Sequence, residues 1–215
     1  MSRYSFKSAV RNNRGAILFL FLMYFFKSAY ADWSPVPSGS MEPTIHPGDF
    51  LWVDKTSYGP TLFFFNKQVA QWGNPSRGDV ITFLPPHTDQ LYVKRVIGVP
   101  DDSLRIEGAN VFVNGAQLEY RLESGVGSDI LGREVIDGRE HQFKLSGNKT
   151  LPYIGKTIEI PEGKYFVMGD HRNDSLDSRY WGLVDRDRVM GKVTSLAFSF
   201  SKERDFFSSV AMPLK

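Results

Sequence analysis

A serine-containing turn and a lysine in an apolar segment supply the residue types that nucleophilic catalysis requires. Ser38 and Ser40 flank Gly39, and prolines at 35, 37 and 43 restrict the backbone around them. A restricted serine loop of this kind can be a reactive site, although a solvated linker has the same composition. A serine nucleophile needs a base, and the Gly-x-Ser-x-Gly setting typical of histidine-assisted hydrolases is absent. Lysine is therefore the alternative base.

Lys94 lies in residues 91–98, Leu-Tyr-Val-Lys-Arg-Val-Ile-Gly, whose other members are mostly apolar. Burial in such a strand would disfavour the ammonium form. Lowering the pKa of a lysine from about 10.4 to about 7 requires roughly 4.6 kcal/mol, which burial can supply. The alternative is that Lys94 or Arg95 is an ordinary charge on an edge strand, and the lysine alone does not decide between the two.

A third polar segment, residues 168–182, places turn-forming residues between charges of both signs. Its charged members include Asp170, Arg172, Asp174, Asp177 and Arg179. Charges that alternate in this way form a network that rigidifies a loop, or they face solvent. The segment also offers Ser175 and Ser178 as hydroxyl partners for a nearby amine. The three segments together favour a catalytic serine-lysine pair.

The composition favours one folded catalytic unit over a disordered, metal-dependent or nucleic-acid-binding chain. The 215 residues are 41% hydrophobic and 23% charged, and none is cysteine, which excludes disulfides and thiol catalysis. The four histidines lack ligand spacing, so we expect no metal and no cofactor. Residues 1–31 hold five basic and no acidic residues, which leaves 21 basic against 24 acidic residues elsewhere. The body of the protein therefore has no basic footprint for nucleic acid.

The N-terminus carries the pattern of a membrane-directed segment. Four basic residues precede a twelve-residue uncharged run, 15–26, after which Lys27 interrupts the apolar stretch. As a helix, residues 15–31 would cover about 26 Å of a hydrocarbon core roughly 30 Å thick, if the lysine reaches the interface. The basic arm would stay on the cytoplasmic side and the rest of the chain would lie outside. The alternative is a cleavable signal peptide that ends in Ala-Tyr-Ala.

The remaining chain has the alternation of an all-β fold. Short runs rich in β-branched and aromatic residues are separated by Gly, Pro, Asn and Asp, and no long helical pattern is present. We expect strands at 50–54, 79–84, 91–99, 110–113, 117–120, 157–160, 164–168 and 190–200. Asn114-Gly115 predicts a type I′ turn between two strands of a hairpin. The predicted fold class is mainly β, with a mostly antiparallel catalytic sheet after the membrane segment and a small inserted β-subdomain.

The expected organisation has five parts. They are a cytoplasmic arm (1–14), a membrane anchor or signal segment (15–31), a catalytic β-domain (32–105 and 157–200), the inserted β-subdomain (106–156) and a C-terminal tail (201–215). The insertion is inferred from residues 124–149, which are richer in glycine and charge than their flanks.

An aromatic cluster in a segment bounded by glycine and proline is a second indication of a membrane. Phe63, Phe64 and Phe65 are adjacent, and Trp72 follows nearby. Three adjacent phenylalanines cannot all face inward on one strand. The segment is either a loop folded over the core or an apolar surface that dips into the outer leaflet, where aromatic side chains favour the interface. On the second interpretation, membrane lipids are a partner.

These segments closely resemble the type I signal peptidase family, which consists of membrane-bound serine-lysine proteases that remove signal peptides from exported proteins. The resemblance spans about residues 33–198, and the order and spacing of the motifs agree. The matching segments are 37–45 around the two serines, 48–53, 77–80 with 92–98 around the lysine, and 169–182.

The resemblance implies a role for each matched polar residue. Ser40 is expected to be the nucleophile, Lys94 the general base, and Ser175 the hydroxyl that orients this lysine. The Ser38 hydroxyl and the Ser40 backbone N–H would hold the oxyanion. The reaction would be acyl transfer to Ser40 followed by hydrolysis, without a cofactor.

Other matched positions are structural, and two depart from the family pattern. Asp177 and Arg179 correspond to an ion pair behind the site. His171 stands where the family usually has Asn, and Asp101 stands at a turn where Gly is commoner. Asp tolerates the left-handed backbone conformation that such a turn requires. The departures suggest a divergent or specialised member.

The implied substrates are preproteins with small residues at the first and third positions before the cut, bound as an extended strand beside the lysine strand. The implied protein is a monomer, held at the outer face of the bacterial cytoplasmic membrane by a single-pass anchor. One alternative is a peptidase for pilin or conjugation precursors, including one that passes the acyl group to an amine. Self-cleaving repressors are disfavoured by the membrane segment and the missing DNA-binding domain. A non-catalytic, membrane-tethered β-module is the remaining alternative.

Overall fold

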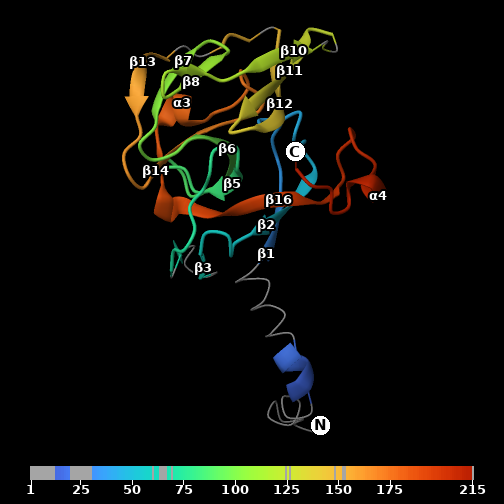
Figure 1. Ribbon diagram of the computed structural model, residues 1–215. Coiled ribbons are helices and arrows are strands. Elements are labelled where there is room, and N and C mark those ends of the chain that lie inside the picture. Colours follow the sequence, from blue (N-terminus) through green and yellow to red (C-terminus); the bar gives the residue numbers. More distant parts are fainter. Residues whose placement is uncertain are drawn as a thin grey trace.

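A seven-stranded antiparallel sheet carries all three polar segments, and smaller sheets are inserted between its strands (Figure 1). The computed structural model describes residues 13–19, 31–59, 61–62, 67–68, 70–123, 125, 127–147, 149–151 and 154–214. In spatial order the large sheet comprises β1 (Ala31–Pro35), β2 (Asp49–Asp54), β16 (Val189–Ser199), β5 (Val80–Phe83), β6 (Tyr92–Gly98), β14 (Lys164–Met168) and β15 (Val184–Asp185). The predicted class, mainly β and antiparallel, is confirmed.

The insertion between β6 and β14 forms two further antiparallel sheets above the large one in Figure 1. One contains β13 (Ile154–Glu159), β7 (Ser103–Glu107), β8 (Asn110–Val113) and β9 (Ala116–Gln117). The other contains β10 (Tyr120–Glu123), β11 (Asp129–Ile136) and β12 (Arg139–Ser146). The remaining elements are the short pair β3 (Thr61–Leu62) and β4 (Lys67–Gln68), the helices α3 (Ser178–Trp181) and α4 (Phe206–Ser209), and a 3₁₀ turn at Arg186–Arg188.

The core of the large sheet covers both faces of its central strands. All four residues of β5 are buried, because Val80 packs into one apolar cluster while Ile81 and Phe83 pack into another. A third cluster joins β6 and β14 to the insertion through residues such as Ile97 and Leu104. Strands buried on both faces form a rigid platform, so side chains that project from β6 have fixed positions.

Two predicted turns have the backbone conformation that their sequence requires. Asn114 and Gly115 have φ angles of 52° and 79°, as a type I′ turn between β8 and β9 demands. Asp101 has a φ of 69°, which is the left-handed conformation expected where the family usually has Gly.

The insertion differs from the prediction in extent and content. Boundaries at 106 and 156 fall inside β7 and β13, and the pairing of these strands extends the insertion to 103–159. The irregular stretch 124–149 contains the hairpin of β11 and β12. The predicted strand 117–120 is divided between β9 and β10, which belong to different sheets. Local patterns missed these pairings because charged residues occupy the exposed faces of the strands.

The C-terminal end of the chain also differs from the prediction, which gave residues 201–215 as a tail. The C-terminal residues do not form a free tail, since the backbone N–H of Leu214 donates to Thr194 of β16 and that of Leu196 to Met212. At the N-terminus, residues 14–19 are helical. Within the described residues, no helix is both long and apolar enough to cross a bilayer. Most of the predicted 15–31 segment lies outside those residues.

Of the predicted aromatic membrane contact, only Trp72 belongs to the described residues. Phe63, Phe64 and Phe65 lie outside the described residues. Trp72 is 64% exposed, and its indole N–H donates to the Thr56 carbonyl at 2.5 Å. Trp72 is therefore a surface residue whose ring is held in place by the backbone.

Candidate active site

The loop between β1 and β2 carries both candidate serines and is fixed by its own turn. The backbone N–H of Glu42 donates to the Gly39 carbonyl at 3.0 Å, and that of Ile45 to Met41 at 2.9 Å. Met41 and Ile45 are 1% and 0% exposed, so they anchor the turn in the core. Because the residues directly after Ser40 are held in this way, the serine has a defined position at the edge of the sheet.

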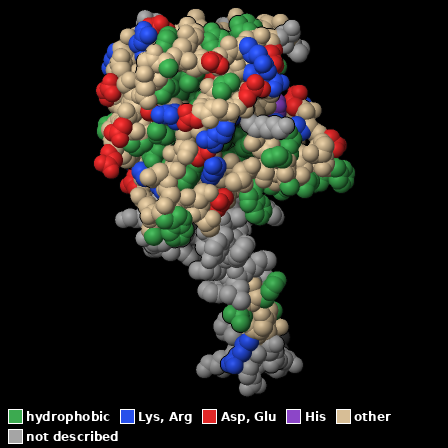
Figure 2. All heavy atoms as spheres, in the orientation of Figure 1, with side chains coloured by type: hydrophobic (Ala, Val, Ile, Leu, Met, Phe, Trp, Pro, Cys, Tyr) green, Lys and Arg blue, Asp and Glu red, His purple; other side chains and the backbone are tan. Residues whose placement is uncertain are grey.

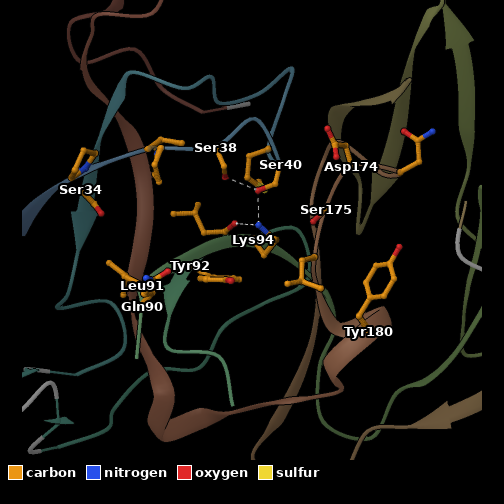
Figure 3. A pocket seen from close by; sticks show the side chains of 17 residues that line it. Ser34, Ser38, Ser40, Gln90, Leu91, Tyr92, Lys94, Asp174, Ser175 and Tyr180 are labelled. Carbon is orange, nitrogen blue, oxygen red and sulfur yellow. Dashed lines mark hydrogen bonds between the residues drawn. The ribbon is translucent and has the colours of Figure 1, made fainter. Parts of the chain in front are cut away.

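Lys94 projects from β6 towards this loop (Figure 3). Its side-chain Nζ lies 2.6 Å from Ser40 Oγ and 2.9 Å from the Val93 carbonyl. Lys94 is 4% exposed, although the charge sits on a strand that local pattern alone could place at an edge. The structure therefore brings the two predicted residues into direct hydrogen-bond contact.

Burial gives Lys94 the protonation behaviour of a general base. Desolvation lowers its pKa from 10.5 to about 8. The carboxylates of Asp177 and Asp170 partly oppose this effect, and the guanidinium of Arg179 adds to it. A neutral amine is therefore accessible near neutral pH, and it can accept a proton from the adjacent hydroxyl.

Ser38 lies on the open side of the same site. Its hydroxyl is 3.4 Å from Ser40 Oγ, and the side chain is exposed. Both serines line a cavity of about 610 Å³ together with Lys94, Val36, Met41, Tyr92 and residues of the segment after β14. A peptide bound in this cavity would contact the Ser40 hydroxyl directly.

Ser175 lines this cavity from the opposite side (Figure 3). It is 7% exposed, and its Oγ has no hydrogen-bond partner among the described residues, so the predicted bond to Lys94 is not formed. Gly169 separates Ser175 from the loop between β1 and β2, which we call the nucleophile loop after its candidate nucleophile, Ser40. A Cβ at Gly169 would lie 2.3 Å from Ser175 Oγ and 2.3 Å from the Ser40 carbonyl oxygen, so only glycine fits between them.

Asp177 and Arg179 form a buried pair behind the lysine. Asp177 is 0% exposed, and its two carboxylate oxygens accept from Arg179 at 2.7 and 2.6 Å. The same carboxylate accepts the backbone N–H of Gly169 at 2.9 Å. The pair therefore holds the segment that contains Ser175 against the end of β14.

A second buried ion pair fixes the nucleophile loop, and the sequence analysis did not assign it. Arg95 donates to both carboxylate oxygens of Asp170, at 2.9 and 2.7 Å. Thr44 of the loop donates to the same carboxylate at 2.5 Å. Neighbouring residues on a strand face opposite sides, so Lys94 and Arg95 serve two different networks. Two adjacent charges in an otherwise apolar strand were the available signal.

The β11–β12 hairpin also reaches the nucleophile loop. Lys144 of β12 donates to Glu42 Oε2 at 2.9 Å, and its backbone forms an isolated bridge with His171. The segment 124–149, expected to be a small inserted subdomain or excursion, thus contacts the loop that carries Ser40. Among the described residues, no group of His, Asp or Glu could hold a metal ion.

Comparisons with known proteins agree on one family. The family profile described as "Signal peptidase, peptidase S26" matches residues 11–198. Signal peptidase I of Pseudomonas fluorescens is 33% identical over 201 residues, covering 86% of this chain and 71% of that protein. Signal peptidase I of Pseudomonas aeruginosa is 34% identical over 197 residues, covering 84% of this chain and 69% of that protein.

A solved structure gives a weaker geometric match. The crystal structure of a signal peptidase I from Enterococcus faecalis covers 56% of this chain and 97% of that one, with 31% identity and a TM-score of 0.38. The family assignment therefore rests on the sequence matches. On those matches, the chain belongs to the signal peptidase family, peptidase S26.

Proposed function

We propose that this protein is a serine endopeptidase that cleaves signal peptides from exported preproteins, with Ser40 as nucleophile and Lys94 as general base. The observation that carries the proposal is the 2.6 Å contact between Ser40 Oγ and a lysine amine that is almost completely buried. A desolvated amine next to a hydroxyl is the arrangement that activates a serine without histidine.

The proposed reaction has two steps. Neutral Lys94 accepts the Ser40 proton while Oγ attacks the scissile carbonyl, and the protonated amine then donates to the leaving amino group. Water, activated by the same lysine, subsequently hydrolyses the acyl-enzyme. The Ser38 hydroxyl and the Ser40 backbone N–H are the proposed oxyanion donors, each worth about 2.7 to 4 kcal/mol.

Ser175 is the proposed orienting hydroxyl for Lys94. Support comes from its burial in the same cavity and from an Oγ that has no partner among the described residues. The proposal requires this oxygen to accept from the lysine in the substrate complex. In catalytic sites such hydrogen bonds often tighten only in the substrate complex.

The proposed substrate is an extended segment with small residues at the first and third positions before the cut. The cavity beside β6 supports the binding of an extended segment, because Val36, Met41 and Tyr92 line it together with Ser40. An extended segment beside a strand binds through backbone hydrogen bonds, so short side chains at alternate positions would determine the specificity.

The proposed location is the outer face of the bacterial cytoplasmic membrane, with the cytoplasmic arm and apolar run of residues 1–31 as anchor. An aromatic surface next to β1 supports this location. It consists of the half-buried Phe50 and Phe198 and the exposed Phe200, Phe206 and Phe207. Phe200 and Phe207 are 69% and 83% exposed, and Figure 2 shows apolar side chains gathered beside α4. Rings exposed in this way favour a lipid interface.

The test compares wild type with Ser40→Ala and Lys94→Ala on a purified preprotein with an Ala-x-Ala site. Both variants should lose cleavage while their melting curves remain cooperative, because each lacks one half of the proton-transfer pair. Lys202→Ala is the control for loss of a surface lysine. Lys202 lies in residues 201–214, which we call the C-terminal arm, and does not line the cavity. Substantial turnover by either dyad variant would disprove the assignment.

A further inference from the structure

His171 lies directly behind the loop that carries Ser38 and Ser40. It is 5% exposed, and its backbone N–H donates to the Ser40 carbonyl at 3.2 Å. Its ring Nδ1 lies 3.3 Å from the Gly39 carbonyl oxygen. A single residue therefore contacts the carbonyls of both peptide groups that flank the Cα of Ser40.

The tautomer of this histidine follows from its partners. A carbonyl oxygen only accepts, so the bond to Gly39 requires the proton on Nδ1. The other nitrogen, Nε2, lies 2.8 Å from Ser146 Oγ and accepts from this hydroxyl when the ring is neutral. The side-chain amide of Asn173 in turn accepts from the backbone N–H of Ser146 and donates to the backbone C=O of Ser146, each at 2.8 Å. The ring is thus oriented by β12.

Because a peptide group is planar, the contact between His171 and the Gly39 carbonyl also restricts the direction of the Ser40 N–H. The only cis peptide bond in the described chain is Glu42-Pro43, so the Gly39–Ser40 bond is trans. In a planar trans peptide the C=O and the N–H point in opposite directions. The Glu42 N–H, at 3.0 Å, and the His171 ring, at 3.3 Å, both contact the Gly39 carbonyl, so the Ser40 N–H points away from both donors. A hydrogen bond to the carbonyl also polarises the amide and strengthens its N–H as a donor.

We propose that His171 is a positioning residue that aims and polarises the Ser40 backbone N–H as an oxyanion donor. The proposal rests on the proposed function, since it presupposes attack by Ser40. It assigns the His171 ring a role in the transition state and none in substrate binding. Asn also has a side-chain N–H that can donate to the Gly39 carbonyl, so it is the conservative substitution at this position.

The experiment compares full-length wild type, His171→Ala and His171→Asn on a peptide with an Ala-x-Ala site. His171→Ala should lower kcat about 10- to 100-fold, less than the outright loss of an oxyanion donor, and change KM less than about threefold. Binding of a peptide aldehyde, whose adduct with Ser40 carries the oxyanion, should weaken by the same factor. His171→Asn should recover most of both losses.

Two further variants separate positioning from general loosening. His171→Phe keeps a ring of similar volume and removes both nitrogens, so it tests the proposal if the alanine variant does not fold. Val111→Ala, in the buried core of the inserted sheet that contains β8, should lower the melting temperature while kcat is kept. If kcat falls equally in both variants at matched loss of melting temperature, His171 has only a structural role.

The outcomes also separate this inference from the proposed function. If Ser40→Ala retains turnover, the serine-lysine assignment itself is wrong. Suppose instead that Ser40→Ala is inactive while His171→Ala and His171→Phe keep the wild-type kcat. The positioning role alone is then overturned, whether or not KM is raised. Failure of His171→Asn to recover aldehyde binding would also count against a donor role.

Discussion

The chemistry of the site depends on how far burial lowers the pKa of Lys94. Desolvation brings this pKa to about 8, against the opposing charges of Asp177 and Asp170. As the proposed general base, Lys94 acts only as the neutral amine, so kcat/KM for a peptide should rise about tenfold per pH unit below pH 8 and level off above it. A pH-rate profile between pH 5 and pH 10 measures this directly.

Two variants test whether the inflection in the pH-rate profile belongs to Lys94. Ser175→Ala should change its shape if this hydroxyl orients the amine in the substrate complex. His87→Ala removes an exposed histidine and should leave the inflection near pH 8 in place. An inflection near pH 6.5 that disappears with one histidine would show that histidine, and not Lys94, is the base.

Ser38 provides a second test at the scale of single residues. Its hydroxyl lies 3.4 Å from Ser40 Oγ at the open side of the cavity. Ser38→Ala should lower kcat about 10²- to 10³-fold with little change in KM, because an oxyanion donor acts mainly in the transition state. Steady-state kinetics check this, with Ser34→Ala, another serine of the cavity, as control. A loss confined to KM would instead indicate a role in binding.

Ser40 and Lys94, whose Oγ and Nζ lie 2.6 Å apart, could be singled out from the sequence because each stands in a recognisable local setting. Residue-level prediction missed the Arg95–Asp170 pair and the contact of Thr44 with the same carboxylate. Judged from its own segment alone, each of these polar residues would be expected at the protein surface. Their pairing arises only when β6, β14 and the nucleophile loop meet in space.

At the scale of elements, the β11–β12 hairpin stabilises the catalytic loops through a buried network. Glu134 of β11 accepts from Arg172, which follows β14, at 3.0 Å and through a second, shorter bond. His141 of β12 lies 3.4 Å from the same carboxylate. Glu134 and Arg172 are 1% and 2% exposed, so the network joins the hairpin to the polar segment in a buried interface.

This network predicts an acid-sensitive stability. Burial alone would raise the pKa of Glu134, but the charge of Arg172 and the His141 ring lower it from 4.5 to about 2. A depressed carboxyl pKa stabilises the fold fully above the unfolded value of 4.5, and this contribution is lost as the pH falls from 4.5 towards 2. Glu134→Gln should therefore destabilise the protein by about 3 to 5 kcal/mol at pH 7, because Arg172 stays buried without a counter-charge.

The difference between wild type and Glu134→Gln should shrink as the pH falls below 4.5. Urea unfolding at pH 7, 4 and 3 measures it. Glu140→Gln, on the same hairpin but exposed and paired with surface arginines, should change stability little at any of these pH values. Equal effects of the two substitutions, or a constant difference at all three pH values, would contradict this account.

The strands that sequence patterns predicted are those whose burial follows from local composition. β5, β6, β14 and β16 are apolar runs, and the structure has them within two residues of the expected positions. β11 and β12 alternate buried residues with charged ones such as Arg133 and Lys144, which pair across strands or with the nucleophile loop. Such strands depend on partners elsewhere in the chain, so a local pattern did not identify them.

At the scale of the whole molecule, the C-terminal arm completes the large sheet. β5 pairs with β16 only as far as Lys192, and beyond it the backbone of residues 211–214 takes the place of β5 beside β16. Leu214 packs against the core cluster that also contains Met41 of the nucleophile loop. The arm thereby places Phe206 of α4 beside Phe198 and Phe200, and Phe207 beside Phe206.

The aromatic surface links the proposed membrane location to activity. Phe50 pairs in register with Pro35, and Pro35 also lines the active-site cavity, so this surface and the site lie on adjoining parts of the sheet. A protein that rests on the bilayer through these rings would hold its site at the depth where a membrane-inserted signal peptide emerges. Burying one phenylalanine side chain is worth about 1.5 to 3 kcal/mol.

Phe200→Ser with Phe207→Ser should therefore lower kcat/KM about tenfold or more for a preprotein reconstituted in lipid vesicles, and change it little for a short soluble peptide. Both side chains are exposed, so the fold should tolerate the change. Leu122→Ser is the matched control, because Leu122 is 55% exposed on β10, in the inserted sheets. Equal losses on the two substrates would indicate damage to the site. An unchanged rate on vesicles would mean that the anchor alone positions the protein.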